Sequence, residues 1–209
     1  MASARKLRGF FADADRTDGC LHNHTEDGGQ IYRYPLVQYK IINGIPTVVA
    51  AEEGISSVHP VLMRSTALQI GKQVYDNPVV DLRLSQHRLG DSRDMLRYRF
   101  LTPWIALNQR NFARYQQADG QEREELLQKT LVGNLLSVCK AFGVTAERTL
   151  CASIRLERVP VFYKGSQMEG FSGEFEVNCQ IPDLMGIGKG TARGFGTVKQ
   201  IYEKGGTFL

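Results

Sequence analysis

The sequence predicts an α+β fold, in which amphipathic helices and short strands follow one another along the chain. In residues 121–142, large apolar side chains recur at spacings of four, four, three and four, which makes one apolar stripe along a helix. In residues 150–156 and 175–181, apolar and polar residues alternate, as in half-buried strands. Asn43-Gly44 separates two runs rich in β-branched residues and is typical of a hairpin with a type I′ turn.

The first part of the chain is predicted to begin with a helix over residues 3–14, with Leu7, Phe10 and Phe11 on one side. Residues 15–30 are polar and contain glycine, which indicates a loop. The two strands of the predicted hairpin then lie within residues 32–53.

A second helix is expected to begin with Ser57 or Ser56 as its N-cap and with Pro60 in its first turn. Another strand is expected within residues 72–89, where apolar residues alternate imperfectly. The run Gly90-Asp91-Ser92 reads as a turn between two domains. We therefore divide the chain into an N-terminal half, residues 1–90, and a C-terminal half, residues 91–209.

The C-terminal half is predicted to open with a strand that ends at Pro103, followed by a short helix over residues 108–118. The helix over residues 121–142, two strands, a glycine-rich loop and a last strand, TVKQIY, complete it. The order strand, helix, strand, strand, loop, strand fits a ferredoxin-like half.

The composition is that of a soluble globular protein, with 42% hydrophobic and 23% charged residues. The net charge of +4 permits a polyanionic partner without demanding one. The four cysteines show no C-x-x-C spacing, so the sequence supports neither a zinc site nor a disulfide framework. No secretory signal or membrane-spanning run is seen, and we expect a cytoplasmic protein with reduced thiols.

The glycine-rich loop lies within residues 181–202 and combines five glycines with two cations. These residues are Gly186, Gly188, Lys189, Gly190, Arg193, Gly194 and Gly196. Glycine allows the backbone to approach a ligand closely, and consecutive N–H groups beside cations favour an anion. The spacing fits neither a Walker loop nor a dinucleotide-binding fingerprint. The alternative is a C-terminal turn whose charges are merely solvated.

Two histidines, His22 and His24, lie two residues apart in the first half. In an extended segment both imidazoles face the same side, and imidazole exchanges protons near neutral pH. The pair therefore suits general acid–base catalysis on a phosphodiester. A metal-ligand pair and two solvated loop residues are the alternatives. A metal-dependent HNH nuclease is excluded because no third ligand lies at a suitable spacing.

Five blocks in the same order resemble a known family. They are LRGFF at 7–11, LHNH at 21–24, YRYPLVQYKI at 32–41, FLTPWIALN at 100–108 and FSGEFEVN at 171–178, with the glycine-rich loop after them. Together they resemble the CRISPR repeat-processing endoribonucleases of the repeat-associated RNA-binding superfamily. The resemblance implies tandem ferredoxin-like (RNA-recognition-motif-like) halves. The first strand of such a half should precede the helix at 3–14, so either the first half lacks this strand or residues precede the chain.

The resemblance also implies a function: a metal-independent endoribonuclease that cleaves CRISPR repeat RNA by attack of a 2′-hydroxyl. Its catalytic residues would be His22 and His24, with Tyr32 as a helper, and it would need no metal and no cofactor. The glycine-rich loop would bind RNA. Arg33 and Lys40 lie on the predicted hairpin and are candidates to bind RNA phosphates, and Lys40 is also a candidate for the cation beside the scissile phosphate. Products would carry 5′-hydroxyl and 2′,3′-cyclic phosphate ends.

The implied partners are CRISPR repeat RNA and its product, crRNA. A place in a Cascade-like effector complex and a homodimer are both compatible with the resemblance. Two other functions remain open: a non-catalytic crRNA-binding subunit of the same superfamily, and a small-molecule-binding ferredoxin-like regulatory module. Tyr32, Tyr34 and Tyr39 are candidates for base stacking, although aromatic residues on a strand more often belong to the core.

Overall fold

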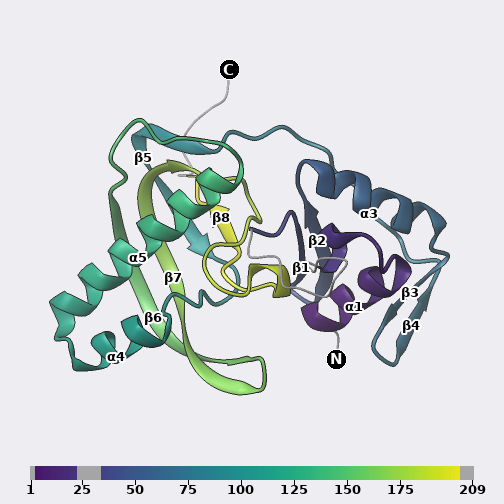
Figure 1. The fold of residues 1–209 in the computed structure, drawn as a ribbon, viewed down its shortest axis with the longest axis horizontal. Coiled ribbons are helices and arrows are strands. Elements are labelled where there is room, and N and C mark those ends of the chain that lie inside the picture. Colours follow the sequence, from purple (N-terminus) through teal and green to yellow (C-terminus); the bar gives the residue numbers. More distant parts are fainter. Residues whose placement is uncertain (1–2, 23–33, 203–209) are drawn as a thin grey trace. The chain divides into compact units, whose positions relative to one another are not determined.

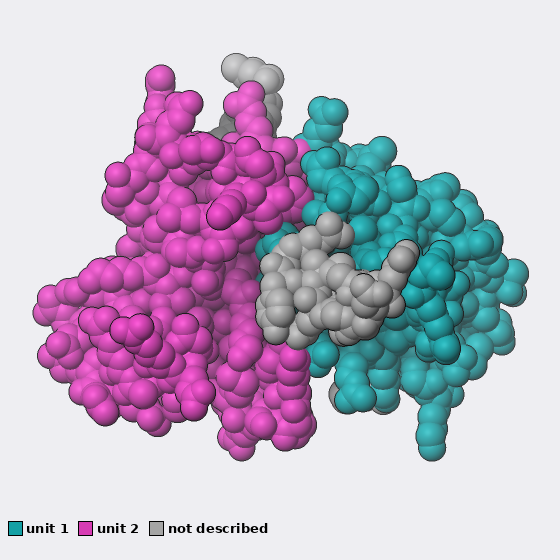
Figure 2. All heavy atoms as spheres, viewed as in Figure 1, with its two compact units in different colours: residues 1–86, 190–195 teal, residues 87–189, 196–209 magenta. Residues whose placement is uncertain are grey.

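The computed structural model describes residues 3–22 and 34–202, with the backbone alone for His22. Two compact units are present (Figures 1 and 2). Unit 1 comprises residues 1–86 and 190–195, and unit 2 comprises residues 87–189 and 196–209. The middle of the glycine-rich loop therefore belongs to the N-terminal unit, although both of its arms belong to the C-terminal one.

Unit 1 begins with helix α1, Ala4–Ala14, as the sequence predicts. Ser3 is its N-cap, and the side chain of Ser3 accepts a hydrogen bond from the N–H of Lys6. In the described part of the chain only this cap precedes α1. A four-residue helix, α2 (Gly19–His22), follows within the stretch that the sequence predicts to be a loop. The side chain of Asp18 accepts a hydrogen bond from the N–H of Cys20 at 2.8 Å and helps to start it.

Strands β1 (Val37–Ile42) and β2 (Ile45–Ala50) pair antiparallel and form the predicted hairpin. Asn43 and Gly44 have φ angles of +50° and +81°, as a type I′ turn requires. The Asn-Gly signal is thus confirmed. The hairpin also fixes which side chains of β1 share a face.

Helix α3 spans Glu53–Arg64, so the predicted start near Ser56 is wrong and Pro60 lies inside the helix. Its N-cap, Glu52, has φ +51° and makes no side-chain capping bond. A second hairpin follows, β3 (Ala67–Ile70) with β4 (Gln73–Asp76). Of the strand predicted within residues 72–89, only β4 forms.

The core of unit 1 joins α1, α2, β1, α3 and β3 through buried side chains. They are Leu7, Phe11, Leu21, Val37, Tyr39, Val58, Val61 and Ile70. The two hairpins, β1-β2 and β3-β4, are separate two-stranded sheets. Strand β1 contacts both α1 and the 190–195 segment.

Unit 2 is built on a four-stranded antiparallel sheet in the order β6-β7-β5-β8 (Figure 1). The strands are β5 (Gly90–Phe100), β6 (Ala152–Tyr163), β7 (Ser166–Gln180) and β8 (Val198–Gln200). This order is the ferredoxin-like one, and the glycine-rich loop takes the place of the second helix. The turn predicted at 90–92 is wrong, because these residues open β5, whose register then shifts between Asp91 and Leu96.

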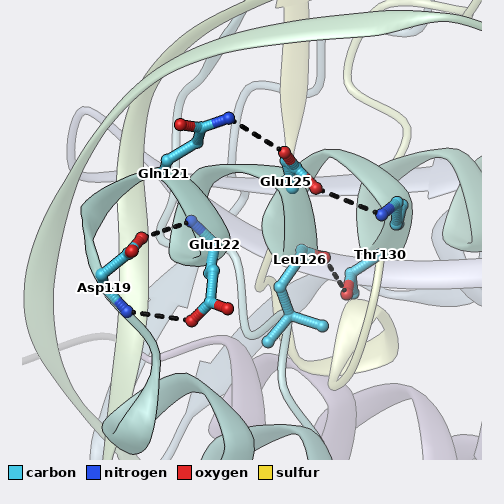
Figure 3. Close-up of polar contacts among 7 residues, drawn as sticks. Asp119, Gln121, Glu122, Glu125, Leu126 and Thr130 are labelled. Atoms are coloured by element: carbon cyan, nitrogen blue, oxygen red, sulfur yellow. Dashed lines mark hydrogen bonds and ion pairs between the residues drawn. The ribbon is translucent and has the colours of Figure 1, made fainter.

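Two helices separate β5 from β6: α4 (Gln109–Gln117) and α5 (Gly120–Ala141), both as predicted. Helix α5 starts with a capping box (Figure 3): Asp119 accepts from the N–H of Glu122, and Glu122 accepts from the N–H of Asp119. Leu127, Leu131, Leu135 and Val138 of its predicted stripe are buried. Phe142 is the C-cap residue.

The hairpin of β6 and β7 is longer than the rest of its sheet (Figure 1). Strand β7 pairs with β5 only from Glu174 onward. Phe171 forms a further antiparallel bridge with Trp104, and residues 166–170 pair with β6 alone. The turn of this hairpin is Lys164-Gly165. The tip of the hairpin, beyond the Phe171 bridge, is therefore paired only within the hairpin itself.

Aromatic side chains form the centre of unit 2, with Trp104 and Tyr98 fully buried. Trp104 lies 5.4 Å from Phe100, ring centroid to ring centroid, in a stacked arrangement. Trp104 is thus a core residue of unit 2. No helix among residues 3–22 and 34–202 is both long and apolar enough to span a membrane.

Candidate functional site

The two arms of the glycine-rich loop are tied to unit 2 by backbone hydrogen bonds. The N–H of Ile187 donates to the carbonyl of Gly196 at 2.8 Å, and the N–H of Gly196 donates to Pro103 at 2.8 Å. The N–H of Lys189 donates to Ile105 at 3.1 Å. Backbone hydrogen bonds thus hold both arms, and the Lys189 and Gly196 bonds attach them to the 103–105 segment. None of these bonds involves the turn between the arms, residues 190–195.

Gly188 shows why the arms are rich in glycine. Its φ is +84°, and a Cβ there would lie 2.4 Å from Nε1 of Trp104 and 2.9 Å from Oδ1 of Asn134. The Trp104 Nε1–H donates to this Asn134 oxygen at 3.1 Å. The space that a side chain would need is therefore filled by the protein itself. Gly186 and Gly196 are buried and Gly188 is half-buried, so three of the five predicted RNA-binding glycines shape the loop.

The turn of the loop, residues 190–195, packs on strand β1 in unit 1. It contains a short 3-10 helix, Thr191–Arg193, that ends at Gly194. A Cβ on Gly194 would lie 2.9 Å from the carbonyl oxygen of Tyr39 and 3.3 Å from Cα of Lys40. The structure thus brings Gly194 and Lys40 together, with Arg193 beside them in the chain. All three are among the predicted RNA-binding residues.

The hydrogen bonds of the turn leave a run of N–H groups for an anion. The N–H groups of Arg193, Gly194 and Phe195 donate to carbonyls within the turn. The N–H groups of Gly190, Thr191 and Ala192 have no acceptor among the described residues. Consecutive N–H groups that have no protein acceptor, next to an arginine in the chain, are the arrangement that favours an anion.

Lys40, predicted to bind RNA, is fully buried in β1. Its Nζ donates to Oε1 of Gln38 at 2.9 Å. Burial in a medium that solvates charge poorly lowers the pKa of Lys40 from 10.5 to about 7. Near neutral pH the amine is therefore present in both its neutral and its charged form.

Gln38 joins Lys40 to a tyrosine and was not singled out in the sequence. Its Nε2 donates to the hydroxyl oxygen of Tyr34 at 2.6 Å and to the carbonyl of Pro35 at 3.3 Å. Gln38 and Lys40 lie two residues apart, so they share one face of the strand. The i, i+2 spacing of Gln38 and Lys40 is the sequence signal that they share a face. A glutamine two residues from a lysine is too common, however, to predict a functional site.

Tyr39 holds the other side of β1 against helix α2. Its side chain is fully buried, and its hydroxyl donates to the carbonyl of Leu21 at 3.0 Å. Burial raises the pKa of this hydroxyl, so it remains a donor over the whole physiological range. Tyr39 is therefore a core residue that fixes the backbone beside His22, and it has no free face for base stacking.

Four predicted site residues have side chains outside the described part of the structure: His22, His24, Tyr32 and Arg33. The backbone of His22 ends α2, directly after the anchored Leu21. Lys189 is exposed, and its Nζ lies 5.5 Å from the ring centroid of Tyr163. Among the described residues, no group of three or more His, Cys, Asp or Glu side chains could hold a metal ion.

Comparison with known proteins supplies the family. Residues 1–88 match the family model for the Cas6b N-terminal domain, and residues 90–201 match the model for the Cas6b C-terminal domain. An uncharacterized protein of Methanocaldococcus jannaschii is 44% identical over 115 residues, which cover 54% of this chain and 78% of that protein.

Two crystal structures are similar along nearly the whole chain. A structure of Cas6b is 37% identical with a TM-score of 0.90, and the match covers 95% of this chain and 91% of that one. A structure of the CRISPR RNA processing endoribonuclease Cas6b is 35% identical with a TM-score of 0.73, covering 95% and 90%. These matches also confirm the α+β fold with tandem ferredoxin-like halves. The chain belongs to the Cas6b family, and its resemblance to the CRISPR repeat-processing endoribonucleases is confirmed.

Proposed function

We propose that the protein is a metal-independent endoribonuclease that cleaves CRISPR repeat RNA to mature crRNA. The observation that carries the proposal is the packing of the cation-bearing turn 190–195 on β1 at Tyr39 and Lys40. That strand anchors Leu21, the residue before His22. The same strand thereby contacts the cation-bearing turn and holds the backbone that leads to His22. The similar Cas6b structure described as a CRISPR RNA processing endoribonuclease supports the same activity.

The chemistry assigned to the two histidines is an internal transfer of the phosphate. One imidazole takes the proton of the 2′-hydroxyl, and the 2′-oxygen attacks the phosphorus. The bond from phosphorus to the 5′-oxygen breaks, and the other imidazole, as imidazolium, gives that oxygen a proton. The products carry a 2′,3′-cyclic phosphate and a 5′-hydroxyl. General acid–base catalysis of this kind contributes about 10²–10⁴-fold, and Tyr32 helps to orient the reacting groups.

Charge that develops on the phosphate is stabilised by Lys40 and by the turn. A phosphate close to Lys40 raises the pKa of its amine, because an opposite charge favours the protonated form. The amine then carries its charge when substrate is bound. Arg193 and the N–H groups of residues 190–192 bind neighbouring phosphate oxygens. Arg33 adds a further phosphate contact.

The enzyme stays bound to its product and delivers crRNA to a Cascade-like effector complex, alone or as a homodimer. Phosphate contacts dominate the affinity, so binding weakens as salt is raised. Unpaired bases of the repeat supply specificity, because single-stranded RNA exposes its base edges and faces.

The deciding experiment incubates the full chain with repeat RNA in EDTA. A matched RNA with a 2′-deoxy sugar at the cut site serves as the second substrate. We expect one cut per repeat in EDTA and no cut in the 2′-deoxy RNA. Cutting that depends on added magnesium, or that ignores the missing hydroxyl, contradicts the mechanism. Binding of RNA without any cleavage identifies a non-catalytic crRNA-binding subunit.

A further inference from the structure

The turn at the tip of the β6–β7 hairpin has a lysine, Lys164, at a position whose left-handed backbone conformation favours asparagine or glycine. Lys164 and Gly165 have φ angles of +51° and +87°. Asn43 and Gly44 of the β1–β2 hairpin have nearly the same angles, +50° and +81°. Asparagine tolerates this left-handed conformation well, whereas lysine adopts it rarely. Strain at an exposed turn points to a role for the side chain there.

The side chain of Lys164 lies over the ring of its neighbour, Tyr163. Its Nζ is 5.9 Å from the ring centroid. The Nζ of Lys189, from the glycine-rich loop, is 5.5 Å from the same centroid. The backbone of Lys189 is fixed by the bond from its N–H to Ile105. One aromatic ring thus gathers two ammonium groups from segments far apart in the sequence.

These two charges have no acid to balance them in the described part of the chain. No ion pair joins Lys164 or Lys189 to a carboxylate among residues 3–22 and 34–202. An ammonium over a tyrosine face is attracted by the ring, but two ammonium groups on one ring repel each other. An anion that contacts both removes this repulsion. A phosphodiester is such an anion, and a polymer of phosphates can reach an exposed tip.

The tip is open to a long ligand. Residues 166–170 of β7 pair with β6 alone, so no further strand of the described chain covers the end of the hairpin. Phe162, two residues before Lys164, is 72% exposed. Lys164 and Gly165 are exposed as well. A nucleic-acid strand can therefore pass along the tip without any change in the sheet.

We propose that Tyr163, Lys164 and Lys189 form a phosphate-binding site for the RNA backbone, here called the tip site. Tyr163 is the positioning residue, because its ring holds both ammonium groups. Lys164 and Lys189 contact the phosphate. This inference rests on the proposed function, since it names a further part of the surface that binds the same RNA. It adds a contact on the β6–β7 hairpin to those of the turn and β1.

The test compares single and double variants of the full chain in filter binding. The ligand is repeat RNA with a 2′-deoxy sugar at the cut site, measured over a range of KCl concentrations. Lys164→Asn removes the charge and creates Asn-Gly, the preferred type I′ turn, so it should fold at least as well as the wild type. Lys189→Gln removes the second charge, and Lys164→Arg retains the first. Lys140→Gln, at an exposed position near the end of helix α5, is the control for net charge.

We expect the double variant Lys164→Asn/Lys189→Gln to bind more weakly at low salt. The slope of log affinity against log salt should become shallower by about 0.7, the value expected when the protein neutralises one phosphate fewer on a single strand. Lys164→Arg and Lys140→Gln should keep the wild-type slope. Tyr163→Leu should weaken binding while all charges remain, because the two ammonium groups are no longer held together.

Two results would overturn the tip site. One is a double variant with wild-type affinity and slope; the other is a loss of affinity with an unchanged slope. In either case the proposed function still stands if the wild type cuts repeat RNA in EDTA. Failure of the wild type to bind or cut repeat RNA rejects both proposals together.

Discussion

The Nζ of Lys40 donates to Oε1 of Gln38 at 2.9 Å, and both side chains are buried in strand β1. A neutral amide can accept this hydrogen bond, but it cannot balance the charge of an ammonium. The burial cost therefore remains, and the pKa of Lys40 falls to about 7. A fully charged lysine would be expected if a carboxylate stood in place of the amide.

Replacement of Lys40 by methionine should change how stability depends on pH. In the unfolded chain the lysine keeps a proton up to about pH 10.4, whereas in the folded chain it loses the proton near pH 7. Between these values the unfolded state binds more protons, so the free energy of unfolding of the wild type rises with pH. The slope from this group is at most about 1.4 kcal/mol per pH unit.

Urea unfolding at several pH values from 6 to 10 measures this difference, with wild type and Lys40→Met in the same buffers. We expect Lys40→Met to be the more stable protein at pH 6. The difference in free energy of unfolding between the variant and the wild type should become smaller as pH rises. A constant difference would mean that Lys40 keeps its ordinary pKa in the folded chain.

Replacement of Gln38 by glutamate should move the pH dependence of RNA cleavage. A carboxylate beside Lys40 favours the charged amine and raises its pKa. If the charged amine assists cleavage, the alkaline fall in kcat/KM moves to higher pH, because this limb reports the essential acid of the free enzyme. The pH–rate profile of Gln38→Glu is the measurement, and Gln38→Met is the comparison without a new charge. If the alkaline limb of the Gln38→Glu profile does not move, the charged amine of Lys40 does not assist cleavage.

Local signals in the sequence predict α1, α5 and the Asn43-Gly44 hairpin well, because a helical stripe or a turn dipeptide acts over a few residues. The start of α3 was missed because Glu52 makes no side-chain capping bond. The nearest capping residues in the sequence, the serines at 56 and 57, lie inside the helix. Strand β3 is too short, at four residues, to show an alternating pattern.

The burial of Lys40 was beyond prediction for a different reason. Lysine is nearly always exposed, and alternation along β1 places it opposite Tyr39 without saying what covers that face. The turn at Gly194, distant in the sequence, packs against the backbone of Lys40 and contributes to its burial. The glycine-rich loop was correctly singled out, yet Gly188 is needed mainly by Trp104 and Asn134 of its own unit. Glycine spacing alone does not distinguish contact with a ligand from contact with the core.

Replacement of His22 or His24 by alanine should abolish cleavage and spare binding. Loss of a general acid or base lowers the rate by about 10²–10⁴-fold. Phosphate contacts made by other residues keep the affinity. Single-turnover cleavage in EDTA and filter binding, run side by side, separate the two effects. His59→Ala, on helix α3, is the matched control and should cleave like the wild type. Wild-type rates in both histidine variants would place the active site elsewhere.

Replacement of Gly194 by alanine should disturb the turn where it packs on β1. The φ of Gly194 is +87°, and the added Cβ would lie 2.9 Å from the carbonyl oxygen of Tyr39. Because this oxygen is a backbone atom, no change of side-chain rotamer can relieve the contact. We expect the free energy of unfolding to fall by about 1–3 kcal/mol. Cleavage should fall further than the reduced stability explains, because Arg193 and the N–H groups of residues 190–192 move with the turn.

Gly133 provides the control for that variant within the same chain. It lies exposed in helix α5, and a Cβ there meets nothing within 4 Å. Gly133→Ala should therefore raise the free energy of unfolding by about 0.5–1 kcal/mol, with cleavage unchanged. Opposite signs for the two alanines, measured by urea unfolding, show that position 194 needs glycine for its packing. If Gly194→Ala instead behaves like Gly133→Ala, the turn does not rest on β1, and the phosphate site proposed there loses its support.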